Sequence, residues 1–224
     1  MNDQMNTHKT SPIIITIEGN IGSGKTTFIK ELINYEKMKN TNTICFLQEP
    51  VNAWESIKNT NNETMIECFY KEQEKYAFSF QIMAYVSRMA LIKQAISNGY
   101  KYIFTERCIY TDRNVFLKML YESNKVEKMN YEIYNMLFET FTQEYNIYHI
   151  YIQTSPEVAL KRVIKRERAG ENNISLEYLT MCNNYHNDWL DNNKKNIMTF
   201  DGNEDDWLKV SYFDTILYKL INLF

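Results

Sequence analysis

The stretch Gly19-Asn20-Ile21-Gly22-Ser23-Gly24-Lys25-Thr26 fits G-x-x-x-x-G-K-[ST], the pattern of a phosphate-binding loop. The β-branched run at residues 13–17 predicts a buried strand before it, and residues 27–37 predict a helix after it. In that order, backbone N–H groups and the helix N-terminus face the phosphates. Lys25 is expected to reach the β- and γ-phosphates, and the Thr26 hydroxyl to hold Mg²⁺. The loop therefore predicts a nucleoside triphosphate site, without saying where the γ-phosphate goes.

Strand-like and helical segments alternate along the rest of the chain. Alternation of this kind predicts an α/β fold, in which helices cover both faces of a five-stranded parallel sheet. Ligands of such sheets bind at the carboxyl ends of the strands. Further strands are predicted at residues 43–48, 102–105, 148–152 and 197–200, and helices at 63–97, 112–121, 131–145, from 156, 176–190 and 207–223.

Composition limits the classes of function. The 224 residues carry a net charge of −3, which argues against a nucleic-acid partner. No apolar run approaches the roughly 20 residues of a membrane span. Residues 1–11 are polar and resemble neither a signal nor a transit peptide, so we expect a disordered tail, a single domain over 12–224 and a cytoplasmic location. The four cysteines are widely spaced, which favours free thiols over disulfides or a zinc site.

Charged residues follow two of the predicted strands. Glu49 comes at the end of the second strand, and a carboxylate there could take a proton from an attacking hydroxyl. Glu106 and Arg107 end the third strand. On its own, Glu49 could equally be a solvated loop acid. Glu106 and Arg107 could equally be an ion pair that holds a loop in place.

Two further groups lie on predicted helices. Gln81, Ala84 and Arg88 share one helix face, and a Gln amide suits the hydrogen-bonding edge of a nucleobase, with Phe80 as an apolar wall. The alternative is a plain amphipathic surface helix. Arg162, Arg166 and Arg168 form a basic cluster that could close as a lid over a phosphoryl group, or be an exposed helix face.

Together and in this order, the groups resemble the deoxynucleoside kinase family from residue 13 to about 218. The resemblance implies a three-layer P-loop kinase fold and a homodimer that phosphorylates the 5′-hydroxyl of deoxyribonucleosides in nucleotide salvage, with ATP as donor and Mg²⁺ as cofactor. The matching pieces are GNIGSGKTT (19–27), QEPVNAW (48–54), YKEQEKYAFSFQ (70–81), ERCIYTDR (106–113), RVIKRERAGE (162–171), LEYLTMCNNYHNDWL (176–190) and DGNED (201–205).

The resemblance also implies roles for individual residues. Glu49 would be the general base for the 5′-hydroxyl proton, and Arg107, with Lys25, would support the transferring phosphate. Glu106 would join Thr26 at Mg²⁺. The phosphate-binding set would comprise Gly19 to Thr27 (Thr27 included) and the arginines 162, 166 and 168 of a lid at about 162–173. The nucleoside would contact Trp54, Tyr70, Phe80, Gln81, Ala84, Arg88, Asp112, Phe116 and Glu171, and the donor base would contact Asn203, Glu204 and Asp205.

Three pocket positions distinguish branches of this family. Ala84, Arg88 and Asp112 resemble the deoxycytidine and purine branch, which leads us to expect those nucleosides in preference to thymidine. Two departures from the family pattern are Cys108, where Ser is usual, and Gly170, where a polar residue is usual and the lid would become looser.

Three other functions are alternatives for this sequence. A thymidine-accepting multisubstrate kinase would belong to the same family but would have different residues in its base pocket. A thymidylate-type monophosphate kinase shares the fold, but segments 48–54 and 70–81 argue against it. A nucleotide-dependent switch would need a guanine motif and a Walker B Asp, and the sequence has neither.

Overall fold

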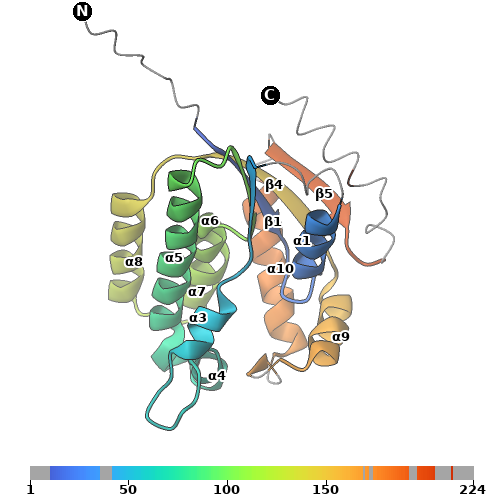
Figure 1. Cartoon of the computed structure of the whole chain (residues 1–224). Coiled ribbons are helices and arrows are strands. Elements are labelled where there is room, and N and C mark those ends of the chain that lie inside the picture. Colours follow the sequence, from blue (N-terminus) through green and yellow to red (C-terminus); the bar gives the residue numbers. More distant parts are fainter. Residues whose placement is uncertain are drawn as a thin grey trace, which may run out of the picture.

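A computed structural model describes residues 11–35, 42–168, 170–171, 174–191, 196–204 and 213 of the chain. Its centre is a parallel sheet with the strand order β2-β3-β1-β4-β5 (Figure 1), which confirms the predicted fold class. The strands are β1 (Ile13–Glu18), β2 (Ile44–Leu47), β3 (Tyr102–Glu106), β4 (Asn146–Gln153) and β5 (Ile197–Asp201). The predicted tail, except Ser11, and the predicted helix at 207–223, except Phe213, lie outside the described residues.

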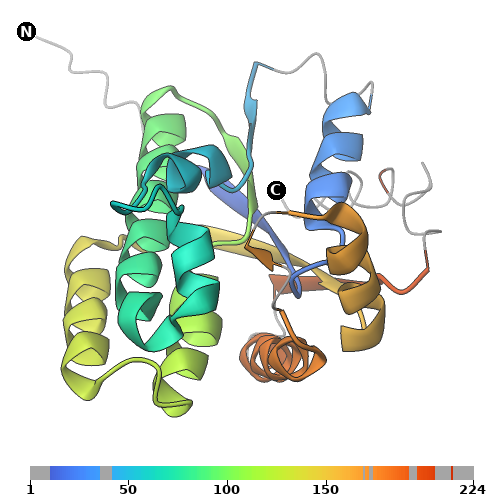
Figure 2. The same cartoon turned by 90° about the horizontal axis from the view of Figure 1, so that it is seen from below.

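Helices cover both faces of the sheet (Figure 2). The helix after the phosphate loop, α1 (Lys25–Asn34), lies on one face, and α5 (Gln73–Ser97), α8 (Lys128–Phe141) and α10 (Leu176–Asp191) lie on the other. The shorter helices are α3 (Val51–Ser56), α4 (Met65–Lys71), α6 (Ile109–Thr111), η1 (Asp112–Leu117), α7 (Lys118–Glu122) and α9 (Pro156–Arg166). Among the described helices, none has a stretch long and apolar enough to cross a lipid bilayer.

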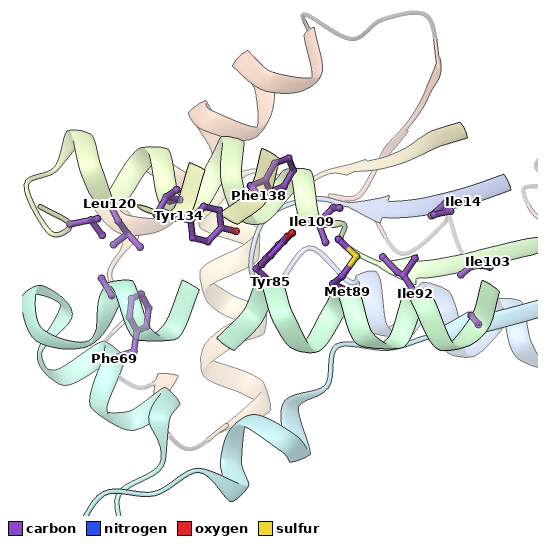
Figure 3. Packing of buried hydrophobic residues seen from close by; sticks show 14 residues of the cluster. Ile14, Phe69, Tyr85, Met89, Ile92, Ile103, Ile109, Leu120, Tyr134 and Phe138 are labelled. Atoms are coloured by element: carbon purple, nitrogen blue, oxygen red, sulfur yellow. The ribbon is translucent and has the colours of Figure 1, made fainter. Parts of the chain in front are cut away.

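The alternation of side chains along β1 divides the core into two clusters. Ile15 and Ile17 pack with Phe28 of α1 on one face, whereas Ile14 packs on the other face with the cluster of α5 and α8. In Figure 3, Tyr85, Met89 and Ile92 of α5 point toward Ile109, Tyr134 and Phe138. Each such side chain contributes roughly 1.5–3 kcal/mol when it is fully buried. This packing fixes α5 against one face of the sheet.

Two predicted helices are wrong in detail. The expected helix at 63–97 is interrupted at Glu72 (φ −139°, ψ 70°), which separates α4 from α5. The expected helix at 112–121 begins as a π-helix over residues 112–117 and becomes α-helical only at Lys118. A π-turn widens the helix by one residue per turn and is frequent at functional sites.

Helix α4 has a complete capping box at its start. The Thr64 hydroxyl accepts a hydrogen bond from the Glu67 backbone N–H at 3.2 Å, and the Glu67 carboxylate accepts one from the Thr64 N–H at 2.7 Å.

Thr64→Ala should therefore lower the free energy of unfolding by about 1 kcal/mol, measured by urea denaturation. As a control, Thr180→Ala removes an exposed hydroxyl from the interior of α10, where the change should stay within about 0.5 kcal/mol. Equal losses in the two variants would contradict the capping role.

Candidate active site

The phosphate loop is a tight cradle between β1 and α1. Gly22 has φ +80°, and a Cβ at this position would lie 2.4 Å from the Ala159 carbonyl oxygen of α9. Only glycine avoids both the left-handed strain and that clash. Lys25 lies across the loop, where its ammonium donates to the carbonyl oxygens of Gly19 at 3.2 Å and Asn20 at 2.7 Å. Lys25 is thus buried within the loop that is predicted to bind the phosphates.

One cavity beside the loop collects every residue predicted to contact the nucleoside. These residues reach it from the loops after β2 and β3, from α3, α4, α5 and η1, and from the segment after α9. The lining residues predicted from the sequence are Ile21, Gly22, Lys25, Thr26, Glu49, Trp54, Tyr70, Phe80, Gln81, Ala84, Arg88, Glu106, Arg107, Asp112, Phe116, Arg166, Arg168 and Glu171, and those not predicted are Ile66, Phe69 and Tyr178.

Aromatic side chains and an amide form one part of this cavity. Phe80 stacks on Phe69 with ring centroids 4.6 Å apart and meets Trp54 edge to face at 5.6 Å. Trp54 is anchored by its indole N–H, which donates to Ser87 Oγ at 2.9 Å. Gln81 is buried beside them, and its Oε1 atom has no hydrogen-bond partner within the described residues. A buried acceptor without a partner carries a free-energy penalty that a bound donor would remove.

A charged network lies at the carboxyl ends of β2 and β3. Glu49 Oε1 accepts from Arg88 Nη2 at 3.4 Å and forms an ion pair with Arg107, whose Nε atom lies 3.1 Å away. Burial works to raise the pKa of Glu49, but the charges of Arg107, Arg88 and Lys25 outweigh it, so the pKa lies below its usual value. Glu49 is therefore a carboxylate throughout the neutral pH range.

Arg88 joins this network to the floor of the pocket. Its Nε atom donates to Asp112 Oδ2 at 3.0 Å, and its Nη1 atom donates to the backbone carbonyl of Glu106 at 2.6 Å. Burial opposes the charged guanidinium, yet Asp112 and Glu49 outweigh it and raise the pKa of Arg88. The two side chains are each only 3% exposed, so Arg88 and Asp112 form a buried ion pair. The alternative of a surface helix face for these residues is thereby excluded.

Thr26 and Glu106 form a pair of oxygen ligands beside the loop. The Thr26 hydroxyl donates to Glu106 Oε1 at 2.7 Å. Burial, followed by the negative charge of Glu49, raises the pKa of Glu106. A carboxylate in this position favours a nearby cation, and one hydroxyl with one carboxylate suits Mg²⁺, which keeps several of its own water ligands. The residues present therefore fit the predicted magnesium site.

The lid arginines divide into two sets. Arg166 Nε donates to Glu171 Oε2 at 2.7 Å, and Arg168 Nη1 lies 3.3 Å from Glu171 Oε1. Arg162 instead donates to the Gly202 carbonyl oxygen at 2.7 Å and does not line the cavity. Gly170 has φ +83°, and a Cβ there would come within 3.1 Å of Glu67 Cα. Glycine at this position therefore permits a close approach to α4.

The predicted donor-base segment is only partly described. Asn203 Oδ1 accepts from the Ser155 backbone N–H at 2.9 Å, and Asn203 Nδ2 donates to Asp201 at 2.8 Å. Glu204 is exposed. Asp205 lies outside the described residues, so its contact with a donor base stays a prediction.

Cys108, which stands where Ser is usual in the family, has the Thr111 hydroxyl as its polar neighbour. The Thr111 hydroxyl lies 3.4 Å from Cys108 Sγ and donates to Glu18 Oε2 at 2.7 Å. Thr111 Oγ1 also accepts from the Cys108 backbone N–H at 3.3 Å. All four cysteines are free thiols, as predicted.

Sequence reasoning missed one polar neighbour of the site. His186 of α10 is fully buried, and its Nε2 atom lies 3.1 Å from Arg107 Nη1. The sequence signal was a histidine within the matching segment 176–190, at the helical spacing of the buried positions 179, 182 and 190, and such a residue is commonly a core histidine with no contact to a site.

Comparisons with known proteins agree with this geometry. The family model described as "Deoxynucleoside kinase" matches residues 15–222. A probable deoxycytidine kinase of fowlpox virus is 29% identical over 194 residues, with 85% of this chain and 75% of the relative covered. Human deoxycytidine kinase is 30% identical over 202 residues, which cover 79% of this chain and 74% of the relative.

A solved structure supports the fold. The deoxyadenosine kinase from M. mycoides, solved with dCMP and a flexible dCDP bound, superimposes with a TM-score of 0.75. The superposition covers 93% of this chain and 99% of that one, with 24% sequence identity.

The phosphate loop and the carboxylate–arginine network beside it define a P-loop phosphotransferase. The match over residues 15–222 makes the identification specific: the chain belongs to the deoxynucleoside kinase family. It is accordingly a kinase of deoxynucleosides, and the family implies ATP as the phosphate donor.

The buried lysine should make nucleotide binding depend on pH. Burial, together with the charge of Arg107, lowers the pKa of Lys25 to about 7 in the free protein. A bound triphosphate favours the ammonium form and raises that pKa, so binding above pH 7 takes up a proton. We expect the affinity for ATP to fall by up to about tenfold per pH unit between pH 7 and 9.

Calorimetry of ATP binding at pH 8, in phosphate and in Tris buffer, measures this proton uptake from the difference in heat. Lys25→Arg is the matched control, because a guanidinium stays charged in this range and takes up no proton. Equal heats in the two buffers for the original protein would contradict the lowered pKa.

Proposed function

We propose that this kinase transfers the γ-phosphate of ATP to the 5′-hydroxyl of deoxycytidine or purine deoxynucleosides in preference to thymidine. The observation that carries the proposal is the buried Arg88–Asp112 pair on the floor of the cavity. A polar pocket disfavours a base that leaves its buried groups without partners. In the proposed binding mode, the 5-methyl group of thymine would be crowded by this guanidinium.

Other groups in the cavity support this base preference. The acceptor oxygen of Gln81 suits an amino group on the base edge, and cytosine and adenine both carry one. Phe116 and Phe80 line the same cavity and suit stacking on a planar base. Relatives named deoxycytidine kinase agree with the preference, although they are only about 30% identical to this chain.

The proposed chemistry assigns a role to each member of the charged network. Glu49 accepts the 5′-hydroxyl proton, while Arg107 and Lys25 stabilise charge on the transferring phosphoryl group. Arg166 and Arg168 close from Glu171 onto the phosphates, and Glu171 and Tyr70 then bind the sugar 3′-hydroxyl. Thr26 and Glu106 would hold Mg²⁺, which would neutralise phosphate charge when bound.

We further propose a homodimer that serves nucleotide salvage. Several large apolar side chains are exposed on the outer face of α8, and Val86 of α5 is exposed as well. An exposed apolar patch of this kind is typical of an interface. The residues on α8 are Met129, Ile133, Met136 and Phe141.

Replacement of the proposed base should slow the chemical step. Glu49→Gln keeps the shape of the side chain but removes the proton acceptor, so kcat should fall by roughly 10²- to 10⁴-fold. The measurement is steady-state phosphorylation of deoxycytidine with ATP and Mg²⁺. Glu55→Gln is the control, because Glu55 lies in the following helix α3 and outside the cavity lining. Near-normal turnover of Glu49→Gln would remove this residue from the role.

Conversion of the pocket should change the base preference. Arg88→Met with Asp112→Ala removes both buried charges together, and should raise the ratio of thymidine to deoxycytidine turnover by tenfold or more, on the order expected for pocket contacts. The assay offers deoxycytidine, deoxyadenosine, deoxyguanosine and thymidine separately, with dTMP as a fifth substrate. The single variant Arg88→Met is the comparison, because it leaves Asp112 as an unpaired buried charge and should be less stable.

The same assay distinguishes the other functions. An unchanged ratio in the double variant would mean that the base is selected elsewhere in the pocket. Dominant thymidine turnover by the original protein would favour the multisubstrate kinase. Activity on dTMP alone would favour a monophosphate kinase.

A further inference from the structure

Arg107 is held in place on several sides. Its backbone has φ +62°, a left-handed conformation that is uncommon for a residue with a side chain, and its N–H donates to the Ile17 carbonyl oxygen at 3.0 Å. Its Nε atom contacts Glu49, and its guanidinium lies over the ring of Phe116, with 4.8 Å from Cζ to the ring centroid. The remaining contact, from Nη1, is to His186.

The surroundings of His186 determine its tautomer. Its Nδ1 atom lies 2.7 Å from the Cys182 carbonyl oxygen, which can only accept, so Nδ1 carries the proton. Arg107 can only donate, so Nε2 has its lone pair directed at Nη1. Burial and the charge of Arg107 both lower the pKa of His186 well below its usual value. The ring is thus a neutral acceptor, with both nitrogen atoms in use.

Such an acceptor orients the guanidinium without competing for its charge. A carboxylate in the place of His186 would form a second ion pair with Arg107 and draw its charge away from a phosphoryl group. The neutral ring takes only one N–H, from Nη1, and Glu49 lies against Nε as an ion pair. Among the described residues no side chain is hydrogen-bonded to Nη2, so the N–H groups of this end of the guanidinium are available to ligand oxygens.

We propose that His186 is a positioning residue for phosphoryl transfer, which holds Arg107 in the orientation that meets the phosphoryl group. The proposal rests on the proposed role of Arg107. It predicts that loss of the Nε2 acceptor affects turnover more than nucleoside binding, because a misplaced group costs most in the transition state.

The test uses two variants of similar polarity. His186→Asn keeps an amide near the Nδ1 position, where it can still donate to Cys182, but has no atom at the Nε2 position. His186→Gln reaches the Nε2 position and offers an acceptor to Arg107. With deoxycytidine, ATP and Mg²⁺, kcat should fall by roughly tenfold to a hundredfold for Asn, and KM should change by less than about threefold. Gln should restore most of kcat.

Controls separate this effect from lost stability. Leu190→Ala shortens a buried side chain in the last turn of α10, away from Arg107, and should lower the melting temperature without lowering kcat at 25 °C. In a background of Arg107→Lys, which lacks the guanidinium, His186→Asn should lower kcat by no more than about twofold.

The outcomes are distinct. Equal kcat values for the Asn and Gln variants, or a kcat loss that follows melting temperature across all variants, would overturn the positioning role. Full activity of Arg107→Lys would overturn the proposed role of Arg107 itself. Loss of activity in Arg107→Lys, together with full activity in His186→Asn, would overturn only the inference about His186.

Discussion

The structure depends on a set of charges that are buried together at the carboxyl edge of the sheet. Removing one ion from water costs several kcal/mol, and only close partners offset that cost. Arg88 accordingly contacts Asp112, Glu49 and the Glu106 carbonyl at once, while Glu49 also contacts Arg107. Since each charge needs its partners, the ends of β2 and β3 and the middle of α5 must keep a fixed mutual position. The pocket therefore gains its rigidity from the groups proposed to act in it.

The same constraint applies to the cations proposed to meet phosphate. Lys25 contacts loop carbonyl oxygens, and Arg166 contacts Glu171, so both cations have partners within the protein. Binding of a triphosphate is then an exchange of partners more than a gain of new ones. Exchange lowers the net free energy available for binding, but it leaves no buried charge uncompensated at any stage. In the proposed closure, the exchange would also couple the phosphate site to Glu171, because Arg166 and Arg168 would leave this carboxylate.

Much of the fold and part of the site could be predicted from the sequence. Parallel strands end at one edge, so the strand pattern alone was sufficient to place Glu49, Glu106 and Arg107 together. The partners of each side chain could not be predicted this way. Arg162, for example, is in the same basic cluster as Arg166 but turns to Gly202. The contact of His186 with Arg107 likewise has no local signal, because it joins residues 79 positions apart.

Two helical segments near the site differ from the sequence-based prediction, at Glu72 and at residues 112–117. Neither glycine nor proline marks the break at Glu72, yet that break separates the α4 residue Tyr70 from the α5 residues Gln81 and Arg88. The π-helix breaks the 3.6-residue period in the segment that carries Asp112 and Phe116. In both places the backbone departs from a regular helix where several side chains must reach one cavity from different directions. Local propensity describes a regular helix well, and a site that requires convergent side chains is where tertiary packing overrides it.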